Sequence, residues 1–254
     1  MKAFPRLFAA LFAVVFAGHA LASPDAVIAQ ARAALGSERL LDGIHSIHFS
    51  GKLASQERVK DKDGKEITRP FNATIDIIFQ KPYRQRVVLV SYKGTEVTAL
   101  DDYEAWRRLE DATNASRWSL TLLDKEQIKR LRASTWENLA FFRGIERSGG
   151  NVEDLGPVTI DGHSCEKLAF VHDPGIAFYR YFDAATGQLL LTELESGDSI
   201  REEGELVVNG VRFPKKLIYT TKDPASIVII TVDKITLNET FPDSLFAVPM
   251  LTVK

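Results

Sequence analysis

The sequence has little of what disulfides, nucleic-acid interfaces and common catalytic sites require. Cys165 is the only cysteine, so no internal disulfide forms and the core must supply the stability. The 32 basic residues are balanced by 34 acidic ones, without a basic tail or stripe, so we expect no nucleic acid as a partner. The chain also lacks a phosphate-binding glycine loop, a nucleophile elbow and internal repeats.

Two short patterns resemble catalytic or metal sites, and both are weak. Ser164 and Lys167 fit a serine-x-x-lysine pattern, but they lie on a predicted strand without the partner motifs. His163 and Cys165 share one face of that strand, yet two ligands are too few for a zinc site, and only His172 follows nearby. We therefore expect no catalytic residue, no metal and no cofactor, and the sequence gives no positive argument for an enzyme.

The N-terminus has the layout of a secretory signal peptide. Lys2 and Arg6 supply the positive charge, residues 7–17 are almost wholly apolar, and Ala20-Leu21-Ala22 forms a small-x-small cleavage site. The apolar run of about a dozen residues is too short to span a bilayer of roughly 30 Å as a helix. We predict that residues 1–22 are removed.

The residue after the cleavage site indicates a protein without a lipid anchor. Bacterial lipoproteins carry a cysteine there, and this chain carries Ser23. We expect a mature protein of residues 23–254 that is free in the periplasm. Its length suits one domain.

Helix signals occur at two places in the mature chain. Ser23 is a suitable N-cap and Pro24 a suitable first residue for a helix that ends at Gly36, with a short further turn over residues 37–41. Asp124 and Gln127 resemble a capping box. After that box, apolar or small residues recur at helical spacing and predict a helix closed by Gly144: Ile128, Leu131, Thr135, Leu139 and Phe142.

Strand signals dominate the rest of the chain. Ala73, Ile75, Ile77 and Phe79 alternate with polar residues, which predicts a strand with one apolar face. Further strands are predicted at 84–92 and 95–100. Hairpin turns are predicted at Asp161-Gly162 and Asn209-Gly210, and a longer hairpin loop at Asp183 to Gly187. Residues 227–232 are nearly all apolar, which predicts a strand covered on both faces.

This order of elements predicts a mainly β fold with α-helices. Antiparallel neighbours joined by short hairpins form a highly curved sheet, and a helix can cover its concave side. Five aromatic residues gather around the second predicted helix: Trp106, Trp118, Trp136, Phe141 and Phe142. They fit an ordinary core, or an apolar ligand cavity whose lid is that helix.

Several short motifs resemble the periplasmic outer-membrane lipoprotein carriers, the LolA family. Phe79-Gln80-Lys81-Pro82-Tyr83-Arg84 is followed by strands and then by Ala99-Leu100-Asp101-Asp102-Tyr103-Glu104-Ala105-Trp106. Lipoprotein-sorting relatives are similar at Ala33-Ala34-Leu35-Gly36, Asp183-Ala184-Ala185-Thr186-Gly187, Phe213-Pro214 and Phe241-Pro242-Asp243-Ser244-Leu245-Phe246. Two positions differ, since Lys81 replaces the family's arginine and Asp102-Tyr103 its Asp-Gly turn.

The resemblance implies an antiparallel half-barrel with helices covering its mouth. Its cavity would hold the acyl chains of lipoproteins or other lipids, and its protein partners would be an inner-membrane release complex and an outer-membrane acceptor. On this basis we predict a ligand site near Phe79, Trp106, Trp118 and Trp136, with Lys81 or Arg84 at its rim. The alternative is a sensor of the same fold that acts through a protein partner.

Overall fold

The computed structural model describes residues 23–114, 116–222 and 226–249. The predicted signal peptide, residues 1–22, lies outside the described residues. The helices are α1 (Pro24–Leu35), α2 (Glu38–Asp42), α3 (Lys125–Leu139), and the 3-10 turns η1 (Ile145–Ser148) and η2 (Asp243–Leu245). The strands are β1 (Ser46–Lys60), β2 (Glu66–Gln80), β3 (Arg84–Ser91), β4 (Gly94–Asp101), β5 (Glu104–Asp111), β6 (Trp118–Leu122), β7 (Asn151–Ile160), β8 (His163–Asp173), β9 (Ile176–Asp183), β10 (Leu189–Leu194), β11 (Ser199–Val208), β12 (Val211–Thr220) and β13 (Ile227–Leu237).

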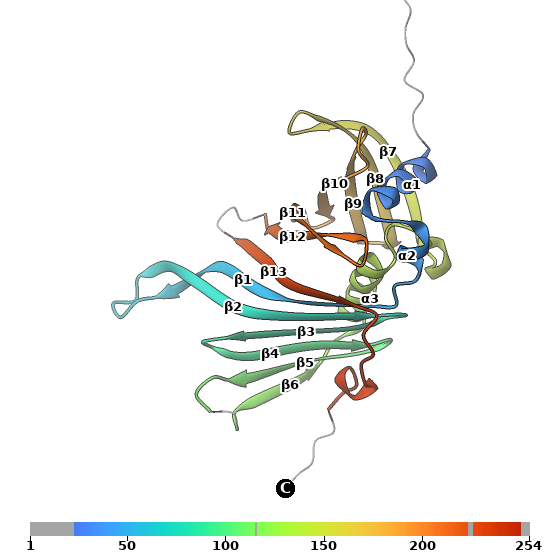
Figure 1. The fold of residues 1–254 in the computed structure, drawn as a ribbon. Helices are drawn as coiled ribbons and strands as arrows, with labels where there is room; N and C mark the ends of the chain where they lie inside the picture. The colour runs from blue at the N-terminus through green and yellow to red at the C-terminus, as the bar shows by residue number, and fades with distance from the viewer. Residues whose placement is uncertain (1–22, 115, 223–225, 250–254) are drawn as a thin grey trace, which may run out of the picture.

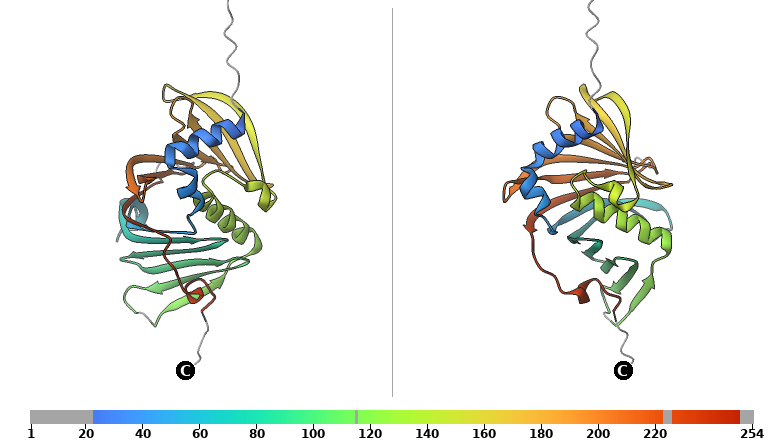
Figure 2. Two further views of the ribbon diagram at one scale, coloured as in Figure 1. Left: turned by 45° about the vertical axis from the view of Figure 1, so that its right-hand side comes forward. Right: turned by 90° about the vertical axis from the view of Figure 1, so that its right-hand side faces the viewer.

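All thirteen strands belong to one open antiparallel sheet. Its order is β6-β5-β4-β3-β2-β1-β13-β12-β11-β10-β9-β8-β7, so β1 and β13 join the first half of the sheet to the second. The sheet curls until β7–β9 run across the direction of β3–β6 (Figure 1). Helix α1 lies across β7–β9 and α3 lies between the two halves (Figure 2). The predicted curved antiparallel sheet with helices over its concave face is confirmed.

The helix starts follow their sequence signals. The Ser23 hydroxyl accepts a hydrogen bond from the Ala26 amide at 3.3 Å and caps α1. At α3, the Asp124 carboxylate accepts from the Gln127 amide at 2.9 Å, and the Gln127 side chain accepts from the Asp124 amide at 3.0 Å. The capping box is therefore complete, and both predicted starts are confirmed.

The end of α3 differs from the prediction. The helix stops at Leu139, and the next turn contains Phe141 and Phe142 with φ values of 48° and 71°. Phe142 is thus not the last residue of the helical stripe. Its left-handed backbone turns the chain sharply and still buries the ring, which is 7 % exposed. Gly144, also left-handed, leads into η1.

The hairpin turns are those that the dipeptides predict. Asp161 and Gly162 have φ values of 51° and 84°, and Asn209 and Gly210 have 51° and 81°. Both turns place two consecutive residues at positive φ, which Asn-Gly and Asp-Gly tolerate best. Asp183 caps its longer loop, because its carboxylate accepts from the Ala185 and Thr186 amides.

The prediction for β13 was wrong over most of its apolar run. Ile227 is 43 % exposed, residues 228–231 are half-buried, and only Val232 is buried. The main contacts of β13 are with its neighbouring strands β1 and β12. A continuous apolar run therefore did not signal burial on both faces here.

The convex face of the first half of the sheet is covered by the segment after β13. Phe246 is fully buried, and with Phe241 it packs against Ile78, whose side chain points away from the concave face. The Trp106 indole Nε1 donates a hydrogen bond to the Phe246 carbonyl at 2.8 Å. Within the described residues, every helix is too short or too polar to cross a membrane.

We expect Phe246→Ala to lower the free energy of unfolding by about 3 kcal/mol, because truncating a buried phenylalanine loses apolar burial and leaves a cavity. Val207→Ala is the control, since Val207 is 60 % exposed and its truncation should cost less than about 0.5 kcal/mol. Urea unfolding followed by circular dichroism measures both. Equal stabilities for the two variants would show that the C-terminal segment does not stabilise the sheet.

Candidate ligand cavity

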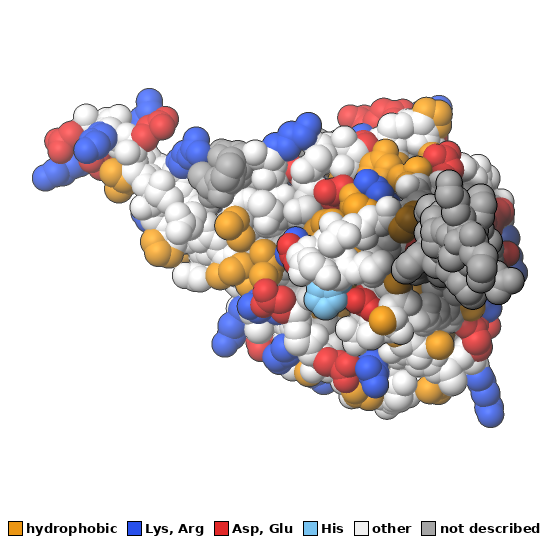
Figure 3. Space-filling model, turned by 90° about the horizontal axis from the view of Figure 1, so that it is seen from above, with side chains coloured by type: hydrophobic (Ala, Val, Ile, Leu, Met, Phe, Trp, Pro, Cys, Tyr) orange, Lys and Arg blue, Asp and Glu red, His pale blue; other side chains and the backbone are white. Residues whose placement is uncertain are grey.

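The concave face of the sheet and the helices enclose a cavity of about 700 Å³. Pockets for small molecules have volumes of roughly 300–1,000 Å³, so this space suits such a ligand. Helix α1, helix α3 and strands from both halves of the sheet contribute to its wall. In the space-filling view, hydrophobic side chains gather at the base of the projecting β1–β2 hairpin, whose tip is charged (Figure 3).

One end of the cavity is apolar. Strand alternation directs every second side chain of β1, β2, β3 and β13 to the concave side. The residues placed there include Phe49, Ile75, Ile77, Phe79, Val87 and Val232. The Phe49 ring meets those of Phe79 and Phe213 edge to face, with centroids 6.2 Å and 6.0 Å apart. This end offers apolar contacts to a ligand.

The other end contains a buried cation, Arg180 of β9. Its side chain is 7 % exposed, and its guanidinium lies 4.6 Å from the Phe142 ring centroid and 4.9 Å from that of Phe170. It forms an ion pair with Glu137 of α3. The second Glu137 oxygen lies 2.6 Å from His172 Nε2. A buried polar network thus joins the lid helix to the sheet.

The guanidinium of Arg180 is only partly satisfied. Nε and Nη1 are buried and have no hydrogen-bond partner. Desolvation lowers the pKa of Arg180, and the charges of Glu137 and Glu202 oppose that effect. Buried polar groups in native proteins are nearly always paired, so two unpaired donors at a cavity wall call for a physical reason.

Glu202 of β11 lines the same polar end. Its side chain is exposed, but to the interior of the cavity. Loss of bulk water raises the pKa of its carboxyl to about 7, although the positive charge of Arg180 acts to lower it. The Glu202 carboxyl is therefore partly protonated near neutral pH.

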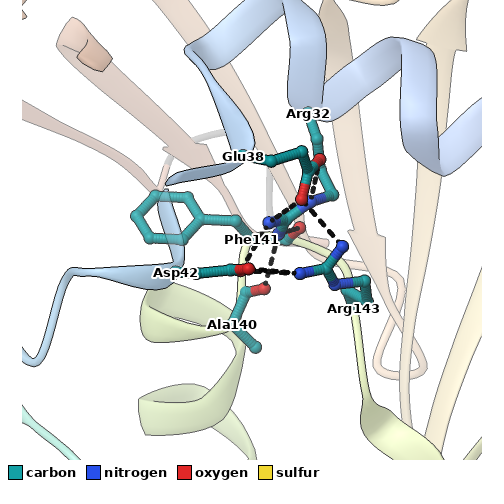
Figure 4. Close-up of polar contacts among 6 residues, drawn as sticks. All are labelled: Arg32, Glu38, Asp42, Ala140, Phe141 and Arg143. Carbon is teal, nitrogen blue, oxygen red and sulfur yellow. Dashed lines mark hydrogen bonds and ion pairs between the residues drawn. The ribbon is translucent and has the colours of Figure 1, made fainter. Parts of the chain in front are cut away.

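A second polar cluster holds the helices together at the edge of the cavity. Arg32 of α1 is 2 % exposed, and its Nη2 donates to Glu38 Oε2 at 2.7 Å and to Asp42 Oδ1 at 2.9 Å (Figure 4). Its Nη1 donates to the carbonyls of Ala140 and Phe141 at 3.2 Å and 2.8 Å. We call these contacts the Arg32 latch.

The latch joins three segments that are separate in the sequence. The two carbonyls belong to the left-handed turn after α3, and the two carboxylates belong to α2. Arg143 reinforces the cluster from the outside, donating to Glu38 and Asp42 at 2.7 Å. The hydrogen bonds that Arg32 donates to the Glu38 carboxylate are the main cause of the raised pKa of Arg32. One arginine therefore fixes the end of α3 relative to α1 and α2.

Comparisons with known proteins agree with this architecture. No family model and no curated protein matches the sequence. A LolA superfamily protein from Nitrosomonas europaea is similar in structure, with a TM-score of 0.57 and 11 % identity over 89 % of this chain and 98 % of that one. The chain has a LolA-like fold.

Two further solved structures support the LolA-like fold. A DUF1329 family protein from Desulfovibrio piger has a TM-score of 0.52 and 12 % identity, covering 88 % of this chain and 96 % of its own. A domain described as that of an outer membrane lipoprotein-sorting protein, from Vibrio parahaemolyticus, has a TM-score of 0.52 and 8 % identity, covering 87 % and 94 %. The resemblance inferred from the short motifs thus holds at the level of the fold.

Of the four predicted ligand-site aromatics, only Phe79 lines the LolA-like cavity. Trp106 is buried on the convex face beneath the C-terminal segment. Trp118 also points to the convex side, is 43 % exposed and lies under the Arg108 guanidinium. Trp136 is on the lid helix, but its ring packs against Phe170 and His172 rather than at the cavity wall.

Neither of the two predicted rim cations is among the residues that line the cavity. Arg84 pairs with Asp101 at 2.8 Å and with Asp243 at 2.6 Å, which places it at the C-terminal segment. Lys81 is exposed after β2, close enough to Asp42 and Arg32 for their charges to act on its pKa. Lys81 therefore lies near the latch.

The weak catalytic patterns have structural explanations. Ser164 and Lys167 are three apart on β8 and so point to opposite faces of the sheet. His163 Nδ1 lies 3.0 Å from Asp183, and Cys165 is fully buried. In the part of the chain that the structure describes, no group of three or more potential ligands could hold a metal ion.

Loss of the latch should destabilise the protein. We expect Arg32→Ala to lower the free energy of unfolding by roughly 3 kcal/mol, because it removes the charged hydrogen bonds that Arg32 donates to Glu38, Asp42 and the carbonyls of Ala140 and Phe141. Arg143→Ala is the matched control, since Arg143 is 51 % exposed and should contribute less than about 1 kcal/mol. Guanidinium unfolding of both variants gives the comparison, and equal losses would contradict a central role for Arg32.

The cavity carboxyl should make stability depend on pH. The folded Glu202 titrates near 7 and the unfolded one near 4.5, so the folded state holds more protons between these values. The free energy of unfolding should therefore fall as pH rises from 5 to 7.5, and this contribution should be absent in Glu202→Gln. Urea unfolding at several pH values tests it. A constant difference between wild type and variant from pH 5 to 8 would refute the shift.

Proposed function

We propose that this protein is a periplasmic carrier that binds acyl chains of lipoproteins or other lipids and moves them towards the outer membrane. The observation that supports it best is the cavity of about 700 Å³ with an apolar end. Burial of each methylene contributes roughly 0.8 kcal/mol, so one acyl chain would gain several kcal/mol on entering. The predicted signal peptide and the absence of a cysteine at its cleavage site agree with a carrier that crosses an aqueous compartment.

A carrier must release its cargo as well as bind it. Helix α3 packs over the sheet through Leu139, and polar contacts also hold it, such as the 3.1 Å hydrogen bond from Thr135 to Gln85 and the Arg32 latch at the turn after it. Polar contacts can be exchanged for water more readily than a packed apolar interface. Such a lid can open when a partner competes for its contacts. The partners we propose are an inner-membrane release complex and an outer-membrane acceptor.

Two substitutions on strand β3 can test whether acyl chains bind inside the cavity. Val87 of β3 faces the cavity, whereas Val90 points to the convex side and is 47 % exposed. We expect Val87→Trp to lower affinity for a fluorescent fatty-acyl probe at least about tenfold, because the indole fills the apolar end. Val90→Trp should bind as wild type does. Equal binding by both variants would place the probe outside the cavity.

Native cargo is best identified by mass spectrometry of organic extracts from protein purified natively from a periplasmic fraction. A stoichiometric acylated lipid or lipopeptide would support the carrier and name its cargo class. Lipid-free protein that also fails to bind the acyl probe would overturn the proposal. Recovery of one inner-membrane regulator without lipid would favour a sensor of the same fold.

A further inference from the structure

The polar end of the cavity contains a buried charged group that the binding of a plain hydrocarbon does not require. A carrier for neutral acyl chains gains nothing from a buried guanidinium, because removing a charge from water is costly. Arg180 is nonetheless directed to the concave face, two residues from Phe178, which also lines the cavity. Its Nε and Nη1 donors are left without partners.

Strand register places the polar groups close together on the concave face. Arg180 of β9 pairs with Thr192 of β10, which pairs with Ile200 of β11. Glu202 follows Ile200 by two residues and so lies on the same face. Thr192 and Glu202 both line the cavity, and Arg180 and Glu202 act on each other electrostatically. Three polar side chains from neighbouring strands thus converge at one end.

The opposite end supplies the complementary surface. Strands β1, β2 and β3 present Phe49, Ile75, Ile77 and Val87 to the same cavity. A ligand that fills the whole space therefore meets a cation at one end and hydrocarbon at the other. This division matches an amphiphile with one small polar head.

We infer that the cavity takes a long-chain carboxylic acid, with its carboxylate at Arg180 and its tail over β1–β3. Nε and Nη1 of Arg180 can each donate a charge-assisted hydrogen bond to a carboxylate oxygen. Both donors are buried, so the Arg180 side chain must turn toward the cavity for a carboxylate to reach one of them while Nη2 stays paired with Glu137. The inference rests on the proposed function and narrows its cargo class from acyl chains in general to those with a free acid head.

The test compares palmitic acid with methyl palmitate, which has the same tail and no charge. We expect wild-type protein to bind the acid roughly tenfold or more tightly than the ester, because only the acid forms the charged hydrogen bonds. In Arg180→Gln this preference should disappear while ester binding is retained. Equilibrium partition of the two radiolabelled ligands gives both affinities.

Two further variants keep the test decisive. Arg180→Gln leaves Glu137 unpaired, so if it does not fold, the double variant Arg180→Gln/Glu137→Gln replaces it and removes both charges of the pair. Arg201→Gln is the matched control, since Arg201 lies on the other face of β11, pairs with Asp161 at 2.6 Å and is 43 % exposed. It should keep the preference for the acid.

Each outcome has a distinct meaning. Equal binding of acid and ester by the wild type, or a preference that persists in the double variant, would overturn the head site and leave the acyl carrier standing. Failure of the wild type to bind either ligand would overturn the head site and the proposed function together. Loss of the preference for the acid in the Arg180 variants, with the preference kept in Arg201→Gln, supports the inference.

Discussion

The Arg32 latch is the contact on which the cavity depends. An open curved sheet does not close its own concave face, so helices must be held against it, and short helical segments do not stay in place without tertiary contacts. Arg32 donates to two carbonyls of the left-handed turn after α3 and to two carboxylates of α2. That turn directs Phe141 and Phe142 into the cavity wall. The Arg32 latch therefore contributes both to the position of the lid helix and to the shape of the cavity.

The unfilled space between the sheet and the lid helix α3 is a second feature of the structure that needs a physical explanation. Protein interiors normally pack at a density of about 0.75, with few voids larger than a water molecule. Here about 700 Å³ stays open between the sheet and α3, although Phe49, Ile77 and Val232 could pack against a closer helix. Leu139 packs on the sheet beside Phe79 and Val232, and Thr135 donates a buried hydrogen bond to Gln85 of β3, so α3 is anchored on the sheet at these two points. The cavity lies beside these anchored contacts.

Local signals in the sequence predicted the secondary-structure elements well, but they predicted the residues of the ligand cavity poorly. Ser23, the Asp124–Gln127 box and the Asp161-Gly162 turn act through bonds within a few residues, so their effect is readable from spacing. Which sheet face is concave depends on the curl of thirteen strands, which alternation alone does not specify. Trp106 therefore looked like a cavity residue and lies on the convex face. Glu202 gave no signal of a site in the sequence, since its neighbours are also charged, and only strand register brings it near Arg180.

The Arg180–Glu137 pair shows why the polar end is not explained by stability alone. Replacing a buried ion pair by apolar residues of similar volume is often neutral or stabilising, because the desolvation cost can exceed the attraction. At this position, flanked by Phe142 and Phe170, apolar side chains would be well accommodated. The pair instead sits where the lid helix, the sheet and the cavity meet, and it leaves two donors unused. A cation that joins the lid helix to the sheet, lines the cavity and has two unpaired donors makes physical sense if a ligand's polar head completes its hydrogen bonding.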